Sequence, residues 1–336
     1  MPRSRWAAGR RICKHTDCGR RQVRPSEGAS MSELLDNRVA IVTGGARGVG
    51  FSIAQTLSMH GAHVLIVDNG CALDGSPEDP TACEAAAERC KGEAIARSVL
   101  EPGVAQEAVD LAVQRFGAVD MVINAAGVVR NHALGEGTAD DFDAVLANGL
   151  TATQRMLHAA VPVMKRQREA GRVPGAVLNL VSSAGIYGRR NALAQSTCSA
   201  AVMGLTRAAA LDLRASRITC NALVPFVGSR SDLDFEPAND SERRYKTQAS
   251  RINPSFAANL AAWLVSSEAA SVTGQLFAVR AREIFLFTQP RPVERVFGGA
   301  GILDADEMSD LVLNKLAAFF TPLETDRDVF NTEPIL

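Results

Sequence analysis

Residues 38–50 read RVAIVTGGARGVG, a short apolar run that leads directly into a glycine-rich loop. The run is rich in β-branched residues, as is typical of a buried parallel strand. Apolar residues then recur with helical spacing through Ile53, Leu57 and Met59. A glycine loop between a strand and a helix lets backbone N–H groups approach a pyrophosphate, and the helix dipole favours that anion. The stretch therefore predicts a nucleotide-binding loop at the start of an α/β domain.

An acidic residue follows the next predicted strand. The run HVLIV (residues 63–67) indicates that strand, and Asp68 comes directly after it. A carboxylate at this position accepts hydrogen bonds from the adenosine ribose and repels a 2′-phosphate. Asp68 therefore favours NAD as the cofactor, while the cationic Arg47 in the glycine loop leaves NADP as the alternative.

Beyond this unit, strand and helix patterns alternate along the chain. Further strands are expected at 94–99, 120–124, 176–181, 217–224 and 274–279, and helices at 82–90, 105–116, 139–168 and 197–213. Strict alternation predicts one Rossmann-like, doubly wound, seven-stranded parallel sheet with helices on both faces. Ligands of such sheets bind at the carboxyl ends of the strands. The polar stretch 229–250 is interpreted as a substrate lid.

The two ends of the chain differ from this central domain, 31–280. Residues 1–30 carry eight basic side chains against Asp17 and Glu27 and lack apolar periodicity, so we expect a basic, disordered extension. Three interpretations compete for it: an upstream start ahead of Met31, an organelle-targeting segment, or a basic tail with a partner. Residues 281–336 form a C-terminal extension, and a helix-like pattern at 306–320 predicts docking on the body or on a partner.

Composition excludes several classes of protein. The 336 residues are 46% hydrophobic with a formal net charge of −1, which provides no global field for nucleic acid or membranes. No apolar run approaches the length of a membrane helix. Seven cysteines without a secretory signal indicate reduced thiols and a cytoplasmic protein. Cys13, His15 and Cys18 lack a second ligand pair, so no metal site is expected.

Together, TGGARGVG (residues 43–50) and Asn124-Ala125-Ala126-Gly127 resemble the short-chain dehydrogenase/reductase family over residues 36–280. The long loop after Asp68 and the segment 283–292 resemble the 3-hydroxyacyl-CoA dehydrogenase unit of multifunctional β-oxidation enzymes and related bacterial steroid-degradation dehydrogenases. The resemblance implies an NAD-dependent oxidoreductase acting on an acyl-CoA or steroid-like small molecule. The cofactor positions that it implies are Thr43, Gly44, Arg47, Gly48, Val49, Gly50, Asp68, Ser98, Val99, Asn124, Ala125, Ala126, Gly127 and Pro225.

The catalytic group of the resembled family is Asn, Ser, Tyr and Lys, the last two spaced Tyr-x-x-x-Lys. Asn148 and Ser182 match the first two, with Ser183 as the alternative serine. Gly204-Leu205 fixes the register of the next helix and places Cys198 at the Tyr position and Val202 at the Lys position. A positioned acid contributes roughly 10²- to 10⁴-fold to a rate, and the lysine charge adds to it.

The absence of a Tyr-x-x-x-Lys pair does not depend on the alignment. The chain has two tyrosines, Tyr187 and Tyr245, and neither is followed by a lysine four positions later. We therefore expect hydride transfer to be impaired or absent, as in a pseudoenzyme. A substitute acid remains an alternative: the Cys198 thiol assisted by Arg189 or Arg190, or Tyr187 from the preceding loop.

Three functions follow from these residues. The first is a dehydrogenase that works by a non-standard acid. The second is a non-catalytic NAD-binding subunit, paired with an active paralogue in a heteromer. The third is a non-redox lyase or hydratase that reuses Ser182 and Asn148. Because the resembled family associates through its long helices, a homodimer or homotetramer is the alternative to the heteromer.

Overall fold

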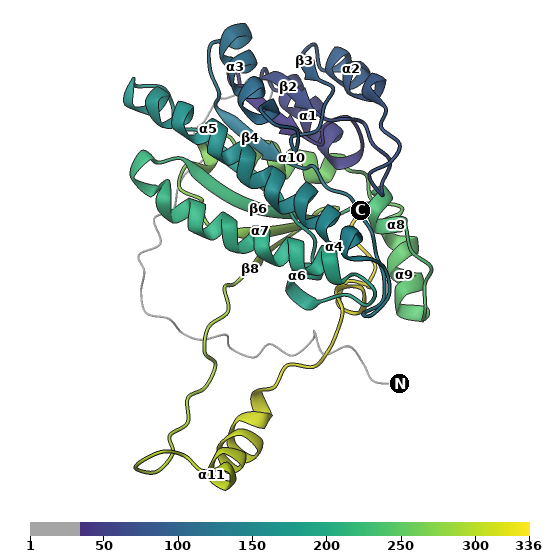
Figure 1. Cartoon of the computed structure of the whole chain (residues 1–336), viewed down its shortest axis with the longest axis vertical. Coiled ribbons are helices and arrows are strands. Elements are labelled where there is room, and N and C mark those ends of the chain that lie inside the picture. The colour runs from purple at the N-terminus through teal and green to yellow at the C-terminus, as the bar shows by residue number, and fades with distance from the viewer. Residues whose placement is uncertain (1–33) are drawn as a thin grey trace. The chain divides into compact units, whose positions relative to one another are not determined.

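The computed structural model describes residues 34–336, without the side chain of Asp232. The interpretations of the basic head and of Cys13, His15 and Cys18 lie outside the described residues. Strand–helix alternation produces a central sheet with helices on both faces, so the predicted fold class is confirmed (Figure 1). The strand order is β3-β2-β1-β4-β5-β6-β7-β8, which reverses direction beside β1. In doubly wound sheets this reversal opens a crevice for ligands at the strand ends.

The strands agree with the expected runs to within a few residues, except that β3 has only three. They are β1 Val39–Thr43, β2 His63–Val67, β3 Glu93–Ile95, β4 Met121–Asn124, β5 Ala176–Leu180, β6 Thr219–Phe226, β7 Leu276–Arg280 and β8 Glu283–Phe287. The first seven pair in parallel, whereas β8 pairs antiparallel with β7. The expected count of seven strands was therefore one short, because EIFLF returns along β7 after a two-residue turn.

Six helices pack against the sheet, and five of them match helices expected from the sequence: α1 Gly48–Met59, α2 Pro80–Arg89, α3 Val104–Phe116, α5 Ala152–Glu169 and α7 Leu193–Asp212. The sixth, α10 Ser255–Leu264, was not expected. Helices α4 Ala139–Leu146 and α6 Ala184–Tyr187 pack against α7. Helices α8 Arg230–Leu233 and α9 Asp240–Ala249 lie in the lid, and α11 Ala305–Ser309 and α12 Asp326–Val329 lie in the C-terminal region. A π-helical segment, η3 Ala147–Thr151, separates α4 from α5, so the single helix expected over 139–168 is divided.

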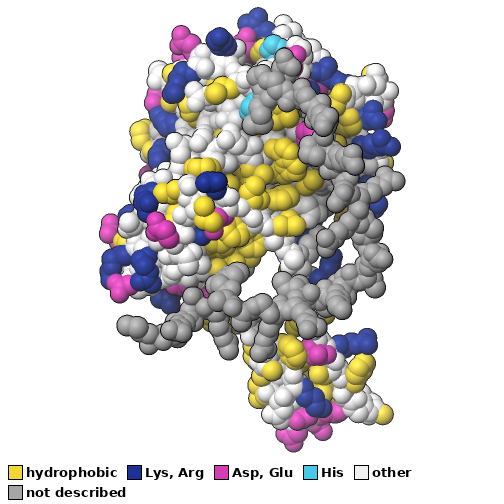
Figure 2. Space-filling view, turned by 180° about the vertical axis from the view of Figure 1, so that it is seen from behind, with side chains coloured by type: hydrophobic (Ala, Val, Ile, Leu, Met, Phe, Trp, Pro, Cys, Tyr) yellow, Lys and Arg dark blue, Asp and Glu magenta, His cyan; other side chains and the backbone are white. Residues whose placement is uncertain are grey.

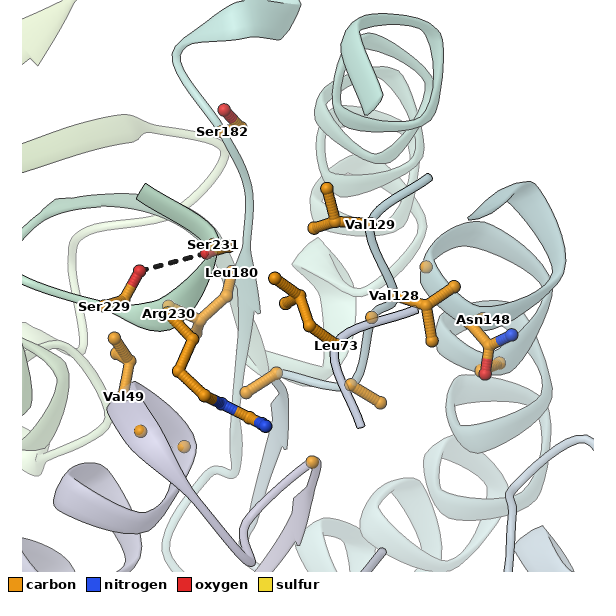
Figure 3. Close-up of a pocket in the computed structure, with 18 of the residues that line it drawn as sticks. Val49, Leu73, Val128, Val129, Asn148, Leu180, Ser182, Ser229, Arg230 and Ser231 are labelled. Atoms are coloured by element: carbon orange, nitrogen blue, oxygen red, sulfur yellow. Dashed lines mark hydrogen bonds between the residues drawn. The ribbon is translucent and has the colours of Figure 1, made fainter. Parts of the chain in front are cut away.

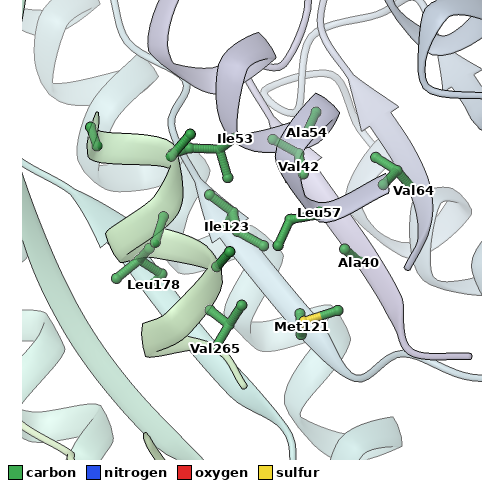
Figure 4. Close-up of a cluster of buried hydrophobic side chains, with 14 of the residues drawn as sticks. Ala40, Val42, Ile53, Ala54, Leu57, Val64, Met121, Ile123, Leu178 and Val265 are labelled. Carbon is green, nitrogen blue, oxygen red and sulfur yellow. The ribbon is translucent and has the colours of Figure 1, made fainter. Parts of the chain in front are cut away.

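Alternate residues of β1 supply two cores, one on each face of the sheet. Ala40 and Val42 pack with Ile53 and Leu57 of α1 and with α10 in one cluster (Figure 4). Val39 and Ile41 pack with α3 and α5 in the other. Because all five residues of β1 are buried, the glycine loop that follows it starts from a fixed point.

The C-terminal region contributes both an edge strand and exposed apolar surface. The side chains of β8 alternate, which leaves Ile284 and Leu286 61% and 59% exposed. Hydrophobic side chains also gather on the face that Figure 2 shows. In the helix-like stretch expected over 306–320, Leu311 is buried, but Leu313 and Phe320 are more than half exposed.

Candidate active site

A cavity of about 270 Å³ lies where the carboxyl ends of the central strands meet the lid (Figure 3). Most of the residues singled out from the sequence line it. They are Gly44, Arg47, Gly48, Val49, Gly50, Asp68, Ser98, Val99, Ala125, Ala126, Gly127, Asn148, Ser182, Cys198 and Pro225. The segments that carry them are far apart in the chain, and the sheet brings them to one edge.

The glycine loop is held in a conformation that other residues would not permit. Gly44 has a φ of +68°, and a Cβ there would lie 2.5 Å from the backbone nitrogen of Ala126. A Cβ on Gly50 would lie 2.1 Å from the carbonyl oxygen of Gly44. Helix α1 has no side-chain cap and no acidic residue in its first turn, so its N-terminal N–H groups remain available for an anion.

Asp68 and Arg47 lie beside this loop and have different hydrogen-bond partners. The Asp68 carboxylate accepts hydrogen bonds from the backbone N–H groups of Ala46, at 2.8 Å, and Gly70, at 2.7 Å. The Arg47 guanidinium pairs with Asp79 at 2.6 Å and donates to the carbonyl oxygen of Cys71. Arg47 is thus engaged with the loop that follows β2, while the carboxylate of Asp68 lines the cavity.

Thr43, Asn124 and Val202 were also singled out, but they do not line the cavity. Thr43 and Asn124 are buried at the ends of β1 and β4, and Asn124 donates to the amide oxygen of Asn179 at 2.8 Å. Asn179 in turn donates to Thr206 of α7, whose hydroxyl donates to the carbonyl oxygen of Val202. This polar chain, Asn124–Asn179–Thr206, ties two strands to α7 below the cavity floor. The Val202 side chain is buried in the core beside it.

The two serines after β5 have different partners. Ser182 is partly exposed to the cavity, and its hydroxyl accepts a hydrogen bond from the backbone N–H of Ala184. Its own backbone N–H donates to the Ser199 hydroxyl at 3.1 Å. The Ser183 hydroxyl is buried and donates to Asp326. Of the two, Ser182 therefore offers the more accessible hydroxyl to a bound molecule.

Asn148 lies within the π-helical segment η3. Its side-chain amide donates to the carbonyl oxygen of Ala144 at 2.9 Å, and the residue lines the cavity. Single π-helical turns are uncommon and are frequent at functional sites. The next residue, Gly149, packs so closely on α7 that a Cβ there would lie 2.4 Å from the sulfur of Cys198.

The Cys198 thiol sits where the resemblance places a tyrosine. It is 7% exposed, and burial raises its pKa to about 11, opposed by a backbone hydrogen bond at Leu150. The thiol consequently keeps its proton at neutral pH. A cationic neighbour would lower this pKa, as a lysine lowers that of a tyrosine in such a site. Of the two arginines considered for this role, Arg190 is exposed and does not line the cavity, and Arg189 has a different partner. Arg189 forms a buried ion pair with Asp326.

Tyr187 also takes a place outside the cavity lining. Its ring packs edge-on against Phe287 and Phe330, at centroid distances of 6.3 and 6.0 Å. Burial raises its pKa, and the carboxylates of Asp326 and Glu324 raise it further. Phe330 also contacts Phe226, which lines the cavity, at a centroid distance of 4.3 Å. The C-terminal region thereby supports one apolar wall of the site.

The C-terminal segment 325–336 joins the site to the lid helix α9. Asp326 is fully buried and binds Arg189 and Ser183 on the side of the cavity. On the other side, Ser241 of α9 donates to the carbonyl oxygen of Arg327. Sequence patterns gave no signal for this contact, because the two partners of its ion pair lie 137 positions apart.

Comparisons with known proteins agree with the geometry. Residues 44–281 match a family model described as enoyl-(acyl carrier protein) reductase. The chain is 33% identical to an uncharacterized oxidoreductase of Mycobacterium tuberculosis, over 73% of this chain and 91% of that one. It is 30% identical to a hydroxyacyl-CoA dehydrogenase of the same species, over 80% of this chain and 84% of that one.

Solved structures are similar as well. A short chain dehydrogenase from Mycobacterium avium superposes with a TM-score of 0.71 at 27% identity, over 84% of this chain and 95% of that one. A carveol dehydrogenase from the same species, solved in complex with NAD, has a TM-score of 0.65 over 74% of this chain and 98% of that one. At 22% identity, this second likeness shows the fold alone. Within residues 34–336, no helix is both long and apolar enough to span a membrane.

Proposed function

Because this chain belongs to the short-chain dehydrogenase/reductase family, we propose that its cavity binds NAD(H) while its own residues support hydride transfer weakly or not at all. The observation that carries the proposal is a contrast between the cofactor side of the site and its catalytic positions. The glycine loop and Asp68 fit a dinucleotide, whereas Cys198 and Val202 stand in place of a phenol and an ammonium group.

The residues present fit the adenosine half of the cofactor. The open first turn of α1 would hold the diphosphate, and Asp68 would accept hydrogen bonds from the ribose. Asp68 would also repel a 2′-phosphate, and the Arg47 guanidinium that could have neutralised it is occupied by Asp79 and backbone carbonyls. We therefore infer a preference for NAD over NADP.

Transfer of a hydride to a carbonyl leaves an oxygen that needs a proton. Bound nicotinamide would supply the hydride, and Ser182 and Asn148 remain to orient a carbonyl and a water. Cys198 could donate a proton, but burial raises its pKa to about 11, and Val202 stands where a lysine would supply a charge. A loss of roughly 10²- to 10⁴-fold in rate is expected from a mispositioned or missing acid.

The substrate class proposed is a 3-hydroxyacyl-CoA or a steroid-like hydroxy compound. Similarity to a hydroxyacyl-CoA dehydrogenase supports it. The loop after β2 adds support, because its Leu73 lines the cavity and its carbonyl accepts a hydrogen bond from Val129. Together with the apolar wall at Phe226, this loop would cover a bulky apolar group.

Binding and turnover should be measured on the same preparation. We expect NADH to bind at micromolar concentration by calorimetry, and no NADH production above blank with a panel of 3-hydroxyacyl-CoA substrates and NAD. Asp68→Ala is the control variant for binding and should have a lower affinity for NADH. Absence of NADH binding by the unmodified protein would refute the proposal, and rapid turnover by this chain alone would refute the inactive-site part of it.

A second candidate function is a non-catalytic subunit that pairs with an active relative. A groove of about 390 Å³ between α5 and α7 favours it, because Leu157, Val161 and Leu205 line a surface that a second chain would cover. Light scattering and affinity capture from the native cell test this candidate. Recovery of a homomer without any related dehydrogenase would exclude the paired arrangement.

A further inference from the structure

Helix α8 brings a cation into the cavity from the lid side. Its first residue, Arg230, lies between Ser229 and Ser231, whose hydroxyls are 3.0 Å apart. The Arg230 side chain extends from the start of α8 into the cavity, between Val49 and Leu73 (Figure 3). It therefore faces the wall that carries the glycine loop and the first turn of α1.

The other charged side chains of the cavity already have partners. Arg47 is bound to Asp79 and to carbonyl oxygens, and Arg97 pairs with Glu101 at 2.9 Å and Glu107 at 2.8 Å. For Arg230, in the part of the chain that the structure describes, no hydrogen bond or ion pair is found. Its guanidinium is thus the lining cation that can approach an anion without giving up an ion pair.

Arg230 shares this cavity with the first turn of α1 and with the loop that follows β2. Burial and the Asp68 carboxylate raise the pKa of the Cys71 thiol in that loop, and the Arg230 charge lowers it. Because Arg230 and the first turn of α1 face the same cavity, an anion seated at the N-terminus of α1 would lie between the N–H groups of the helix and the Arg230 guanidinium. Planar guanidinium groups match phosphate oxygens by paired hydrogen bonds.

We propose that Arg230 binds the diphosphate of the dinucleotide from the lid side, opposite the glycine loop. This inference rests on the proposed function, because it names a further residue for the same ligand. It also assigns a positive charge of the site to the lid, whereas on α7 the uncharged Val202 occupies the position where the family has a lysine. Binding of the cofactor then depends on the position of α8, and through α9 on the C-terminal segment 325–336.

The test compares Arg230→Gln with Arg230→Lys and with Arg244→Gln, an exposed lid residue that does not line the cavity. Arg230 is exposed, so its variants should fold, which circular dichroism checks. Affinities for NADH and for ADP-ribose are measured by calorimetry and fluorescence at low and high salt. ADP-ribose retains the diphosphate and lacks the nicotinamide.

We expect Arg230→Gln to lower the affinity for both ligands about tenfold at low salt. This is the size expected for the loss of one charge-assisted hydrogen bond at a partly exposed site. Arg230→Lys should be intermediate, and Arg244→Gln unchanged. The salt dependence of affinity should be smaller in Arg230→Gln. Equal affinities of Arg230→Gln and the unmodified protein would overturn the assignment.

Two other results are distinguishable. If Arg230→Gln lowered the affinity for NADH but not the affinity for ADP-ribose, Arg230 would contact the nicotinamide end of the cofactor. That result would overturn the assignment to the diphosphate. Failure of the unmodified protein to bind either ligand would instead refute the proposed function, on which this inference rests.

Discussion

The buried ion pair between Arg189 and Asp326 allows the strongest prediction about stability. The Arg189 and Asp326 side chains are 3% and 0% exposed. Asp326 accepts hydrogen bonds from Arg189, from the Ser183 hydroxyl and from the backbone N–H of Arg327. In Asp326→Ala the Arg189 charge would stay buried without its carboxylate. Breaking a buried pair in this way costs about 3–5 kcal/mol of unfolding free energy.

We expect a value near the lower limit, about 3 kcal/mol, because Gln195 still accepts a hydrogen bond from Arg189 at 3.3 Å. Ser183→Ala removes one hydrogen bond and should cost about 1 kcal/mol. Replacing both charged partners by apolar residues, in Arg189→Met with Asp326→Leu, should restore most of the loss, because no unpaired charge remains.

Urea unfolding followed by circular dichroism measures these differences. Asp240→Asn is the matched control, because Asp240 pairs with Arg243 on the surface, where the two side chains are 77% and 61% exposed. That variant should unfold at nearly the same urea concentration as the unmodified protein, because solvent screens an exposed ion pair. If Asp326→Ala lost no more stability than this control, or if the double variant lost at least as much stability as Asp326→Ala, the reasoning from a buried charge would be wrong.

Three further predictions concern the cavity. Gly50→Ala places a Cβ against the Gly44 carbonyl and should abolish NADH binding, whereas Gly117→Ala, strained at φ +82° but far from any contact, should cost about 1–2 kcal/mol of stability and leave binding intact. Because the folded pKa of Cys198 is raised from 9.0 to about 11, its thiol should resist alkylation at pH 8 in the folded protein and react in urea. Its contribution to the unfolding free energy should be fully present below pH 9 and decline by about 1.4 kcal/mol per pH unit between pH 9 and 11, a decline that Cys198→Ala should remove. Asp68→Asn should lower the ratio of NADH to NADPH affinity, and an unchanged ratio would contradict the role given to the carboxylate.

Local patterns were sufficient for the βα unit and for most of the sheet. The strand at 63–67 and the glycine loop depend on residues adjacent in sequence, so periodicity and glycine content identified them. Helix α9 also had a local signal that was missed: Asn239 caps the helix by accepting a hydrogen bond from the backbone N–H of Glu242 at 2.9 Å. The stretch was interpreted only as a polar lid.

Other parts of the site depend on contacts that a sequence pattern does not encode. The pairing of Arg189 with Asp326 joins segments 137 positions apart. The assignment of Arg189 as an aid to Cys198 failed to anticipate this, since proximity in sequence was the only guide. Likewise Arg230 lay in a polar run where any of several charged residues could have faced the cavity.

The polar chain Asn124–Asn179–Thr206 has a consequence for how such a protein changes over evolutionary time. It holds α7 on the sheet through side chains below the cavity and touches position 202 only at the backbone carbonyl. Selection for a folded protein therefore acts on the anchor separately from the chemistry at positions 198 and 202, where the fold requires only side chains that fit their buried surroundings. A lineage can lose its chemistry at these two positions, or regain it, while the architecture around them persists.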